Sequence, residues 1–219
     1  MLTYEDIRKN EDIRTYIIEA DKSLQALGFT EHSFAHVGKV ADTAKYILTT
    51  LGYDGHVVEL AKIAAYLHDI GNLINRQEHS QSGAIMAFRI LDKLGMGAAD
   101  IAPVVTAIGN HDEGTGVAVN AVAAALILGD KTDVRRSRVR NSDVSTFDIH
   151  DRVNYSVKES GVVINEEKTE IILSLKIDTN FSAVMDYFEI FLGRMVMCRK
   201  AAETLGLRFR LVINGQQLL

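Results

Sequence analysis

The chain has 219 residues, of which 47% are hydrophobic and 24% charged, and its composition is that of a folded globular protein. Its formal net charge of −5 argues against nucleic-acid binding, and its single cysteine, Cys198, excludes an internal disulfide and a cysteine-based zinc site. No apolar run reaches the roughly 18 residues that a membrane span needs, and the first residues are charged, so we expect a cytoplasmic protein.

The first part of the chain has the apolar periodicity of α-helices. It predicts helices over residues 10–28, 33–51, 57–68, 79–94, 101–110 and 117–130. Gly71 is placed to end the third helix, which puts His68 and Asp69 in its last turn, and Asp100 is placed to cap the fifth. The last helix is almost wholly apolar and should be buried. We therefore expect residues 1–145 to form a helical domain.

After about residue 145 the pattern changes. Residues 153–164 and 168–178 are rich in β-formers, residues 181–205 have helical spacing, and residues 207–213 predict a last strand. We expect a mainly α protein in which residues 146–219 form a small C-terminal α+β appendage of the order β-β-α-β. The apolar stripe of its helix either forms only the core of the appendage, which we favour, or also mediates self-association, so a homodimer stays open.

Six residues of metal-ligand type lie at or near the predicted helix ends, where several helices can converge on one cavity. They are His36, the doublet His68-Asp69, His79, His111 and Asp130. Imidazole and carboxylate together suit Zn, Mn or Fe. An aspartate at the end of a helix as apolar as the one before Asp130 is costly to bury unless a cation offsets its charge. The pattern therefore predicts a divalent-metal site.

The other polar candidates are weaker. His32 lies one helical turn before His36, so it faces the same cleft if the helix extends that far. We expect His56, in a glycine-rich loop, and His150, beyond the helical body, to be solvated. Asp112 is either a further ligand or solvated, and we favour the second interpretation. Cys198 is expected to be a small buried hydrophobe.

The order of the six residues resembles the pattern of the HD superfamily of metal-dependent phosphohydrolases. His36, His68-Asp69 and Asp130 match that pattern residue by residue, within the stretches 64–71 (AAYLHDIG) and 129–133 (GDKTD). His79 and His111 resemble the additional histidines of the two-metal branch, which includes the HD-GYP phosphodiesterases and the bacterial diadenosine tetraphosphate hydrolases. The resemblance covers roughly residues 30–140 and implies an HD-domain helical bundle.

The resemblance also implies a ligand set and a reaction. One metal would be held by His36, His68, Asp69 and Asp130, and a second by His79 and His111, with Asp69 as a bridge. His68 and Asp69 would be the catalytic centre, where a metal-activated water cleaves a phosphomonoester or phosphodiester bond of a nucleotide. The metal, Fe, Mn or Zn, stays open. Cationic side chains near the last ligand are expected to bind the phosphate: Lys131, Arg135 and Arg136.

The chain departs from the HD-GYP pattern. Asn72 stands where that group has a lysine, and residues 110–114 (NHDEG) replace its paired histidines and Gly-Tyr-Pro motif. Hydrolysis of cyclic dinucleotides is therefore not supported, and the substrate stays open. Two other interpretations also stay open: a non-catalytic nucleotide-binding sensor of the same fold and a di-iron oxygenase.

Overall fold

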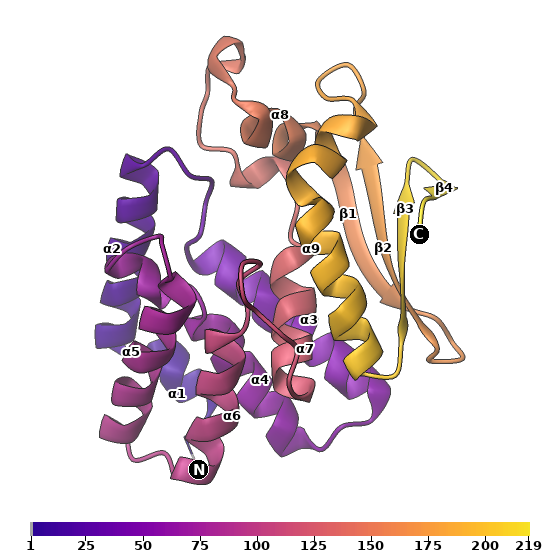
Figure 1. Ribbon diagram of the computed structural model, residues 1–219. Coiled ribbons are helices and arrows are strands. Elements are labelled where there is room, and N and C mark those ends of the chain that lie inside the picture. Colours follow the sequence, from indigo (N-terminus) through magenta and orange to yellow (C-terminus); the bar gives the residue numbers. More distant parts are fainter. Residues whose placement is uncertain (1) are drawn as a thin grey trace.

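The computed structural model describes residues 2–219, which form a helical body with a small mixed sheet along one side (Figure 1). The predicted fold class, mainly α with a C-terminal α+β appendage, is confirmed. The helices of the body are α1 (Tyr4–Lys9), α2 (Glu11–Ala26), α3 (Phe34–Leu51), α4 (Gly55–Leu67), α5 (His79–Lys93), α6 (Ala98–Gly109) and α7 (Ala121–Lys131).

Helices α1, α6 and α7 differ from the sequence-based expectation. Helix α1 was not expected, because six residues are too few to show a periodicity; it begins at a capping box between Thr3 and Asp6. Helix α6 begins at Ala98, so Asp100 lies in its first turn and is not its cap. Helix α7 begins only after Asn120, whose side chain accepts a hydrogen bond from the Ala123 amide.

Gly71 does not end α4. That helix ends at Leu67, and Gly71 lies inside a 3-10 helix, η1 (Ile70–Leu73). A Cβ atom at Gly71 would lie 2.0 Å from the His79 carbonyl oxygen and 2.5 Å from the Gly83 nitrogen. The residue is therefore glycine because η1 packs directly against the backbone of α5. This packing brings the residues just before η1 to the beginning of α5.

Helix α7 is the centre of the body, as its apolar sequence predicts. It packs against α3, α4 and α6, and every one of its residues after Ala121 is buried. Gly129 of α7 approaches α3 so closely that a Cβ atom there would lie 2.8 Å from the Val40 carbonyl oxygen. The carboxyl end of α7, with Asp130, thus lies in the middle of the helical body.

The appendage contains the predicted β-β-α-β order with one more helix and one more strand. Its elements are α8 (Ile149–Ser156), β1 (Val157–Ile164), β2 (Glu170–Ile177), α9 (Val184–Thr204), β3 (Arg208–Ile213) and β4 (Gln216–Gln217). The strands lie in the order β1-β2-β3-β4, and only the β2–β3 pair is parallel. The expectation that a strand begins at residue 153 is wrong, because the Asp148 side chain caps a helix there. Two short 3-10 helices, η2 (Arg136–Arg138) and η3 (Val144–Thr146), lie between α7 and α8.

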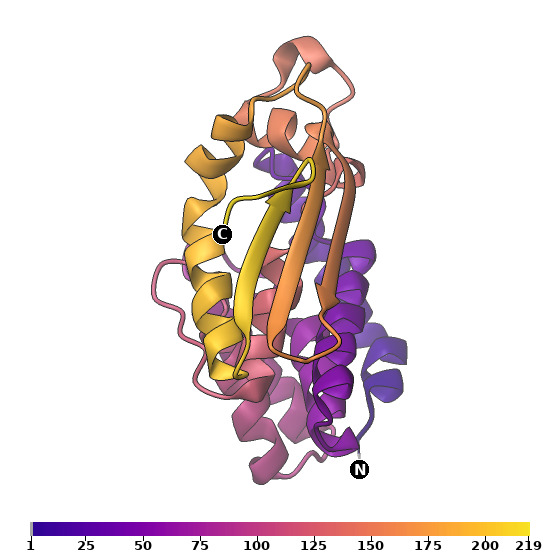
Figure 2. The ribbon, with the colours of Figure 1, turned by 90° about the vertical axis from the view of Figure 1, so that its right-hand side faces the viewer.

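Helix α9 joins the appendage to the body. It packs against both β3 and α7, and the other face of the sheet is turned outward (Figure 2). Cys198 of α9 is buried, as expected, and Met185 and Leu192 are exposed. The homodimer stays a prediction. Among the described residues, no helix combines the length and apolarity that a membrane-spanning segment needs.

Candidate metal centre

The six predicted ligands lie together and are buried, although they come from separate elements. His36 lies in the first turn of α3, His79 begins α5, and His111 follows the end of α6. His68 is the carboxyl cap of α4 and Asp69 the residue before η1, while Asp130 lies in the last turn of α7. Potential ligand atoms lie within 4.8 Å of one another in two groups, His36–His68–Asp130 and His68–Asp69–His111.

One half of the centre is built from two histidines and two carboxylates. The His36 Nε2 atom lies 3.3 Å from Asp130 Oδ1 and 3.7 Å from Asp69 Oδ2. The His68 Nε2 atom lies 3.2 Å from the same Asp69 oxygen and 3.7 Å from the same Asp130 oxygen. Two imidazole nitrogens and two carboxylate oxygens thus surround one point.

The other half uses the second oxygen of Asp69. Its Oδ1 atom lies 3.5 Å from His79 Nε2 and 4.0 Å from His111 Nε2, and the two Nε2 atoms are 3.1 Å apart. The Asn72 side chain donates a hydrogen bond of 2.9 Å to this oxygen, which restrains the rotation of the carboxylate. Asp69 therefore presents one oxygen to each histidine pair.

The Nδ1 atom of each ring is held from behind. Backbone carbonyl oxygens lie 2.7 Å from Nδ1 of His68, 3.0 Å from that of His79 and 2.7 Å from that of His111. His36 uses a carboxylate instead, with its Nδ1 atom 2.8 Å from Asp133 Oδ2. Since these partners only accept hydrogen bonds, each Nδ1 carries the proton and each Nε2 lone pair is directed at the centre.

These lone pairs provide the test of whether a metal fits. Among the described residues, the Nε2 atoms of His36 and His68 are buried without a hydrogen-bond partner, which is costly for a polar atom. The Nε2 atoms of His79 and His111 also bring two lone pairs within 3.1 Å of each other; a cation relieves their repulsion, and Arg76 Nη1 lies 3.3 Å from the His79 atom. Mixed nitrogen and carboxylate donors suit Zn, Mn or Fe. The residues thus fit a divalent metal.

The charge states of the side chains also fit a cation. Burial lowers the pKa of His79 and His111, so both rings are neutral at neutral pH. Burial opposes ionisation of Asp69, but the adjacent His68 ring holds the pKa of that carboxyl well below its ordinary value. Burial likewise opposes a charge on His68, yet the Asp69 and Asp130 carboxylates raise the pKa of this ring. The ionised carboxylates of Asp69 and Asp130 therefore attract positive charge to the centre.

Asp133 supports the centre and was missed as a functional residue. Its carboxylate accepts from His36 Nδ1 and, at 2.8 Å, from Arg135 Nε, while Arg138 donates to its backbone oxygen at 3.0 Å. Although burial opposes it, the hydrogen bond with His36 lowers the pKa of Asp133 well below its ordinary value. The available signal was its position three residues after Asp130, within one helical turn.

The residues expected to bind phosphate have protein partners in the structure. The Lys131 Nζ atom lies 2.8 Å from Asp130 Oδ2 and 3.4 Å from Glu113. Arg135 pairs with Asp133 and Glu31. Arg136 donates to the Tyr155 carbonyl oxygen at 2.6 Å, and its guanidinium lies over the aromatic ring of the same tyrosine. All three phosphate contacts stay predictions, and of the three residues only Lys131 contacts one of the six clustered residues.

Arg76 is a cation at the centre that sequence reasoning missed. Its Nη1 atom lies 4.0 Å from Asp69 Oδ1 and 3.3 Å from both Asn72 Oδ1 and His79 Nε2. With His79 and Asp112, it lines a cavity of about 460 Å³. No sequence signal separates Arg76 from an ordinary surface arginine, because its contacts arise from the turn after η1.

The remaining histidines differ in their distance from the centre. The His32 ring contacts the His36 ring edge-on, with centroids 5.5 Å apart, and its Nδ1 atom bonds the Thr30 carbonyl oxygen at 2.6 Å. His56 is partly exposed and bonds Asp100 at 2.8 Å. The His150 side chain is 59% exposed, which confirms the expectation that it is solvated. Only His32 thus adjoins the cluster.

A helical body with a buried cluster of histidines and aspartates at its helix ends defines a metal-binding class of domain. The family model of the HD domain matches residues 33–153, more than half of the chain, and the protein belongs to this family. Its predicted membership in the HD superfamily is thereby confirmed.

The chain is also similar to two individual proteins. It is 26% identical over 199 residues to the uncharacterised protein MJ1020 of Methanocaldococcus jannaschii, covering 79% of this chain and 76% of that relative. It resembles the crystal structure of a predicted HD superfamily hydrolase from an uncultured Thermotogales bacterium at 27% identity and a TM-score of 0.44, covering 57% of this chain and 67% of the other.

Proposed function

We propose that the protein is a divalent-metal-dependent phosphohydrolase that cleaves a phosphomonoester or phosphodiester bond of a nucleotide. The observation that carries this proposal is the convergence of the unpartnered, buried Nε2 atoms of His36 and His68 on the carboxylates of Asp69 and Asp130. Imidazole lone pairs and ionised oxygens directed at one point are what a bound cation requires. Membership in the HD family and the hydrolase description of the Thermotogales protein agree with this function.

The charge balance around the centre supports an anionic substrate. Ion pairs connect equal numbers of carboxylates and cations: Asp69, Asp130, Asp133, Glu31 and Glu113 with Arg76, Lys131, Arg135, Arg138 and Arg194. These charges cancel while the histidines are neutral. Any divalent ion therefore leaves the centre with a net positive charge, which favours a phosphate over a neutral or cationic ligand.

We assign His36, His68, Asp69 and Asp130 to a first metal, and His79 and His111 to a second, with Asp69 as the bridge. Bound divalent ions supply a water of lowered pKa and neutralise charge on phosphoryl oxygens. Asp69 supports this assignment because its two oxygens face different histidine pairs, and Asn72 restrains the carboxylate in that orientation.

We also assign cationic side chains to the phosphate. Arg76 lines the cavity beside His79, so its guanidinium is placed to bind a phosphoryl oxygen of a substrate that enters there. The Lys131 ammonium group forms an ion pair with the other carboxylate of the centre, Asp130. Arg135 and Arg136 would reach the substrate only after leaving their protein partners, so we rank them below the other two.

Metal analysis and a nucleotide panel test the function. We expect about two divalent ions per chain, phosphate release from at least one nucleotide, and loss of both in His68→Ala. The matched control is His150→Ala, which removes an exposed histidine and should retain the metal and the activity. We expect His79→Ala to bind one ion fewer. A wild-type content near one ion per chain would rule out the second site.

Two other functions are outcomes of the same experiment. If the metal-loaded protein binds a nucleotide but releases no phosphate, and His68→Ala leaves that binding unchanged, the protein is a nucleotide-binding sensor. If turnover requires oxygen, it is an oxygenase. Phosphate release under anaerobic conditions excludes oxygenation as the main activity.

A further inference from the structure

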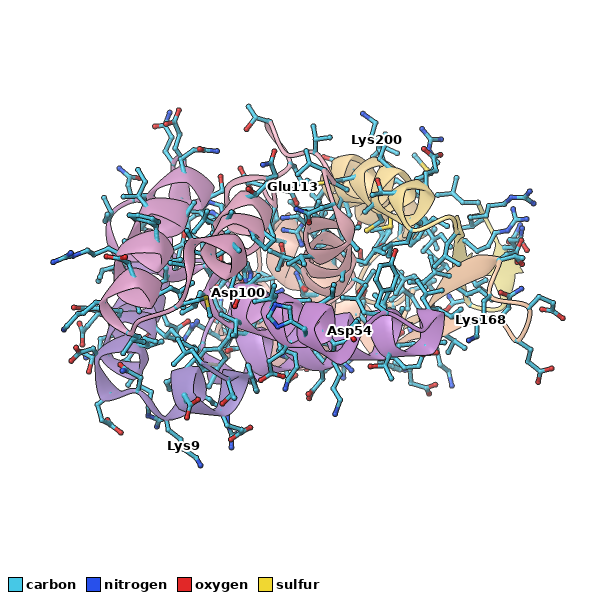
Figure 3. The ribbon with its side chains drawn as sticks, turned by 90° about the horizontal axis from the view of Figure 1, so that it is seen from below. Lys9, Asp54, Asp100, Glu113, Lys168 and Lys200 are labelled. Atoms are coloured by element: carbon cyan, nitrogen blue, oxygen red, sulfur yellow. The ribbon has the colours of Figure 1, made fainter. Side chains whose placement is uncertain are left out.

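Glu113 connects the helical body to the appendage. It lies on the loop between α6 and α7, and its Oε1 atom is 2.8 Å from Arg194 Nε of α9 and 3.4 Å from Lys131 Nζ of α7. Figure 3 shows Glu113 on this loop beside α9. A single carboxylate oxygen thus holds together two cations from different parts of the chain.

One of these two cations, Lys131, adjoins the metal centre. The Lys131 Nζ atom is also 2.8 Å from Asp130 Oδ2, and the other oxygen of Asp130 faces His36 and His68. Only the width of the Asp130 carboxyl group separates this lysine from the cluster of histidines. Only the Asp130 carboxyl group therefore lies between a ligand at the metal centre and Lys131, and Arg194 is next to Lys131 through the shared Glu113 oxygen.

Glu113 is the outermost of the three groups. Its side chain is 30% exposed, compared with 25% for Arg194 and 5% for Lys131, so the lysine is the buried member of the three. Glu113 lies on a surface loop with Gly114 next to it. The carboxylate can therefore turn into solvent without opening the core, and its departure leaves two adjacent cations with an open side.

We propose that Lys131 and Arg194 form an anion subsite beside the metal centre, and that the Glu113 carboxylate occupies it in the absence of substrate. This inference rests on the proposed function, which identifies the anion as a phosphate group. A guanidinium and an ammonium that already hold one carboxylate oxygen present the donors that a phosphate oxygen accepts. Arg194 of the appendage takes the place that sequence reasoning gave to Arg135 and Arg136.

The subsite specifies the substrate class further. With one phosphoryl group at the metals, a second phosphate group of the same molecule reaches Lys131 and Arg194, so the substrate carries at least two linked phosphates. Glu113 then acts as an internal competitor. Removing its negative charge strengthens binding of such a ligand, whereas removing the Arg194 charge weakens it.

The experiment measures binding of methylenediphosphonate, a diphosphate analogue that is not hydrolysed, to the Mn²⁺-loaded full-length chain by calorimetry at constant free Mn²⁺. We expect Glu113→Gln to bind about fivefold more tightly than wild type and Arg194→Met about tenfold more weakly. The double variant should lose the gain. Matched controls on exposed positions of α9, Glu189→Gln and Arg199→Met, should bind within twofold of wild type.

Orthophosphate separates a second phosphate of the substrate from a single phosphate at the subsite. It is expected to bind at the metals, so Arg194→Met should change its affinity by less than twofold. If this variant weakens orthophosphate and the diphosphonate equally, the assignment to a second phosphate is wrong.

Misfolding cannot explain a gain of affinity in Glu113→Gln, so this variant is the decisive one. Affinity for the diphosphonate equal to or below that of wild type would overturn the subsite and leave an ion pair with a purely structural role. If the subsite variants behave as expected but no nucleotide is cleaved, the proposed function fails while the subsite stands. If a nucleotide is cleaved but Glu113→Gln and Arg194→Met bind the diphosphonate like wild type, the subsite fails while the proposed function stands.

Discussion

The hydrogen bond between Asp133 and His36 decides which nitrogen of His36 faces the metal centre, and the substitution Asp133→Asn tests this. In the wild type, the carboxylate accepts from His36 Nδ1 at 2.8 Å, so the Nε2 lone pair faces Asp130 Oδ1 at 3.3 Å. Arg135 Nε donates to the other Asp133 oxygen at 2.8 Å. In the variant, the amide oxygen keeps the bond with this arginine, which turns the amide NH2 group toward His36.

An amide donor at that position requires an unprotonated Nδ1 atom, which moves the ring proton of His36 to Nε2. A protonated Nε2 atom cannot bind a metal. To bind the metal, His36 must return its proton to Nδ1, and the amide of the variant then loses its hydrogen bond with either Arg135 or His36, at a cost of about 1–3 kcal/mol. We therefore expect metal affinity to fall between about 10- and 100-fold, the usual range for loss of a group that orients a ligand.

Competition with a chromogenic chelator measures the affinity for Co²⁺ or Zn²⁺, and ¹⁵N spectra of the metal-free protein report the tautomer of His36. Asp143→Asn, which removes the same charge from an exposed 3-10 turn, should bind the metal within twofold of wild type. Two results would contradict this role of Asp133: a proton that stays on Nδ1 of His36 in Asp133→Asn, or a metal affinity of this variant within threefold of wild type.

Three further predictions concern packing, pH and metal removal. Gly71→Ala should lower the free energy of unfolding in urea by about 3 kcal/mol or more, because the added Cβ meets backbone atoms at 2.0 and 2.5 Å. Gly38→Ala, at a position within α3 where a Cβ meets no atom within 4 Å, should raise this free energy by about 0.5–1 kcal/mol. Equal stability of the two variants would contradict the packing of η1 on α5. Burial raises the pKa of Cys198 from 9.0 to about 12, so between these values only the unfolded chain loses the thiol proton and stability falls with rising pH. The plot of unfolding free energy against pH should have a shallower slope in Cys198→Ala than in wild type, by at most about 1.4 kcal/mol per pH unit. Identical slopes would show that the thiol does not contribute to this pH dependence. Chelation should lower the thermal midpoint of wild type but not that of Asp69→Asn, since a ligand at about 100 times its Kd stabilises by about 2.7 kcal/mol; an unchanged wild-type midpoint would show that the centre holds no stabilising metal.

Much of the fold was predictable because its signals are local. The apolar sequence of α7 predicted a buried helix. The helix predicted over residues 33–51 ends at Gly52, whose φ of +83° suits a residue without a side chain. The short helices α1 and α8 were missed because six to eight residues carry too little periodicity. Gly71 was assigned to a helix end because glycine is favoured both at a helix terminus and where two backbones are in close contact, and the sequence does not distinguish the two cases.

Some residues of the candidate centre were likewise predictable from the sequence, and others were not. Residue type and order alone indicated His36, His68-Asp69, His79, His111 and Asp130, because the chemistry of a ligand belongs to its side chain. Asp133, Arg76 and Arg194 were not found, because an aspartate or arginine acquires such a role only from its neighbours in space.

The sequence by itself therefore determined the class of domain, the set of side chains able to bind a metal, and the helix ends that carry them. Only the tertiary structure decided which imidazole nitrogen faces the centre, how the two oxygens of Asp69 are divided between histidine pairs, and which cations lie beside Asp130. The physical reason is that hydrogen-bond direction and electrostatic interaction depend on distances between atoms. Those distances join elements far apart along the chain, as Glu113 joins α7 to α9.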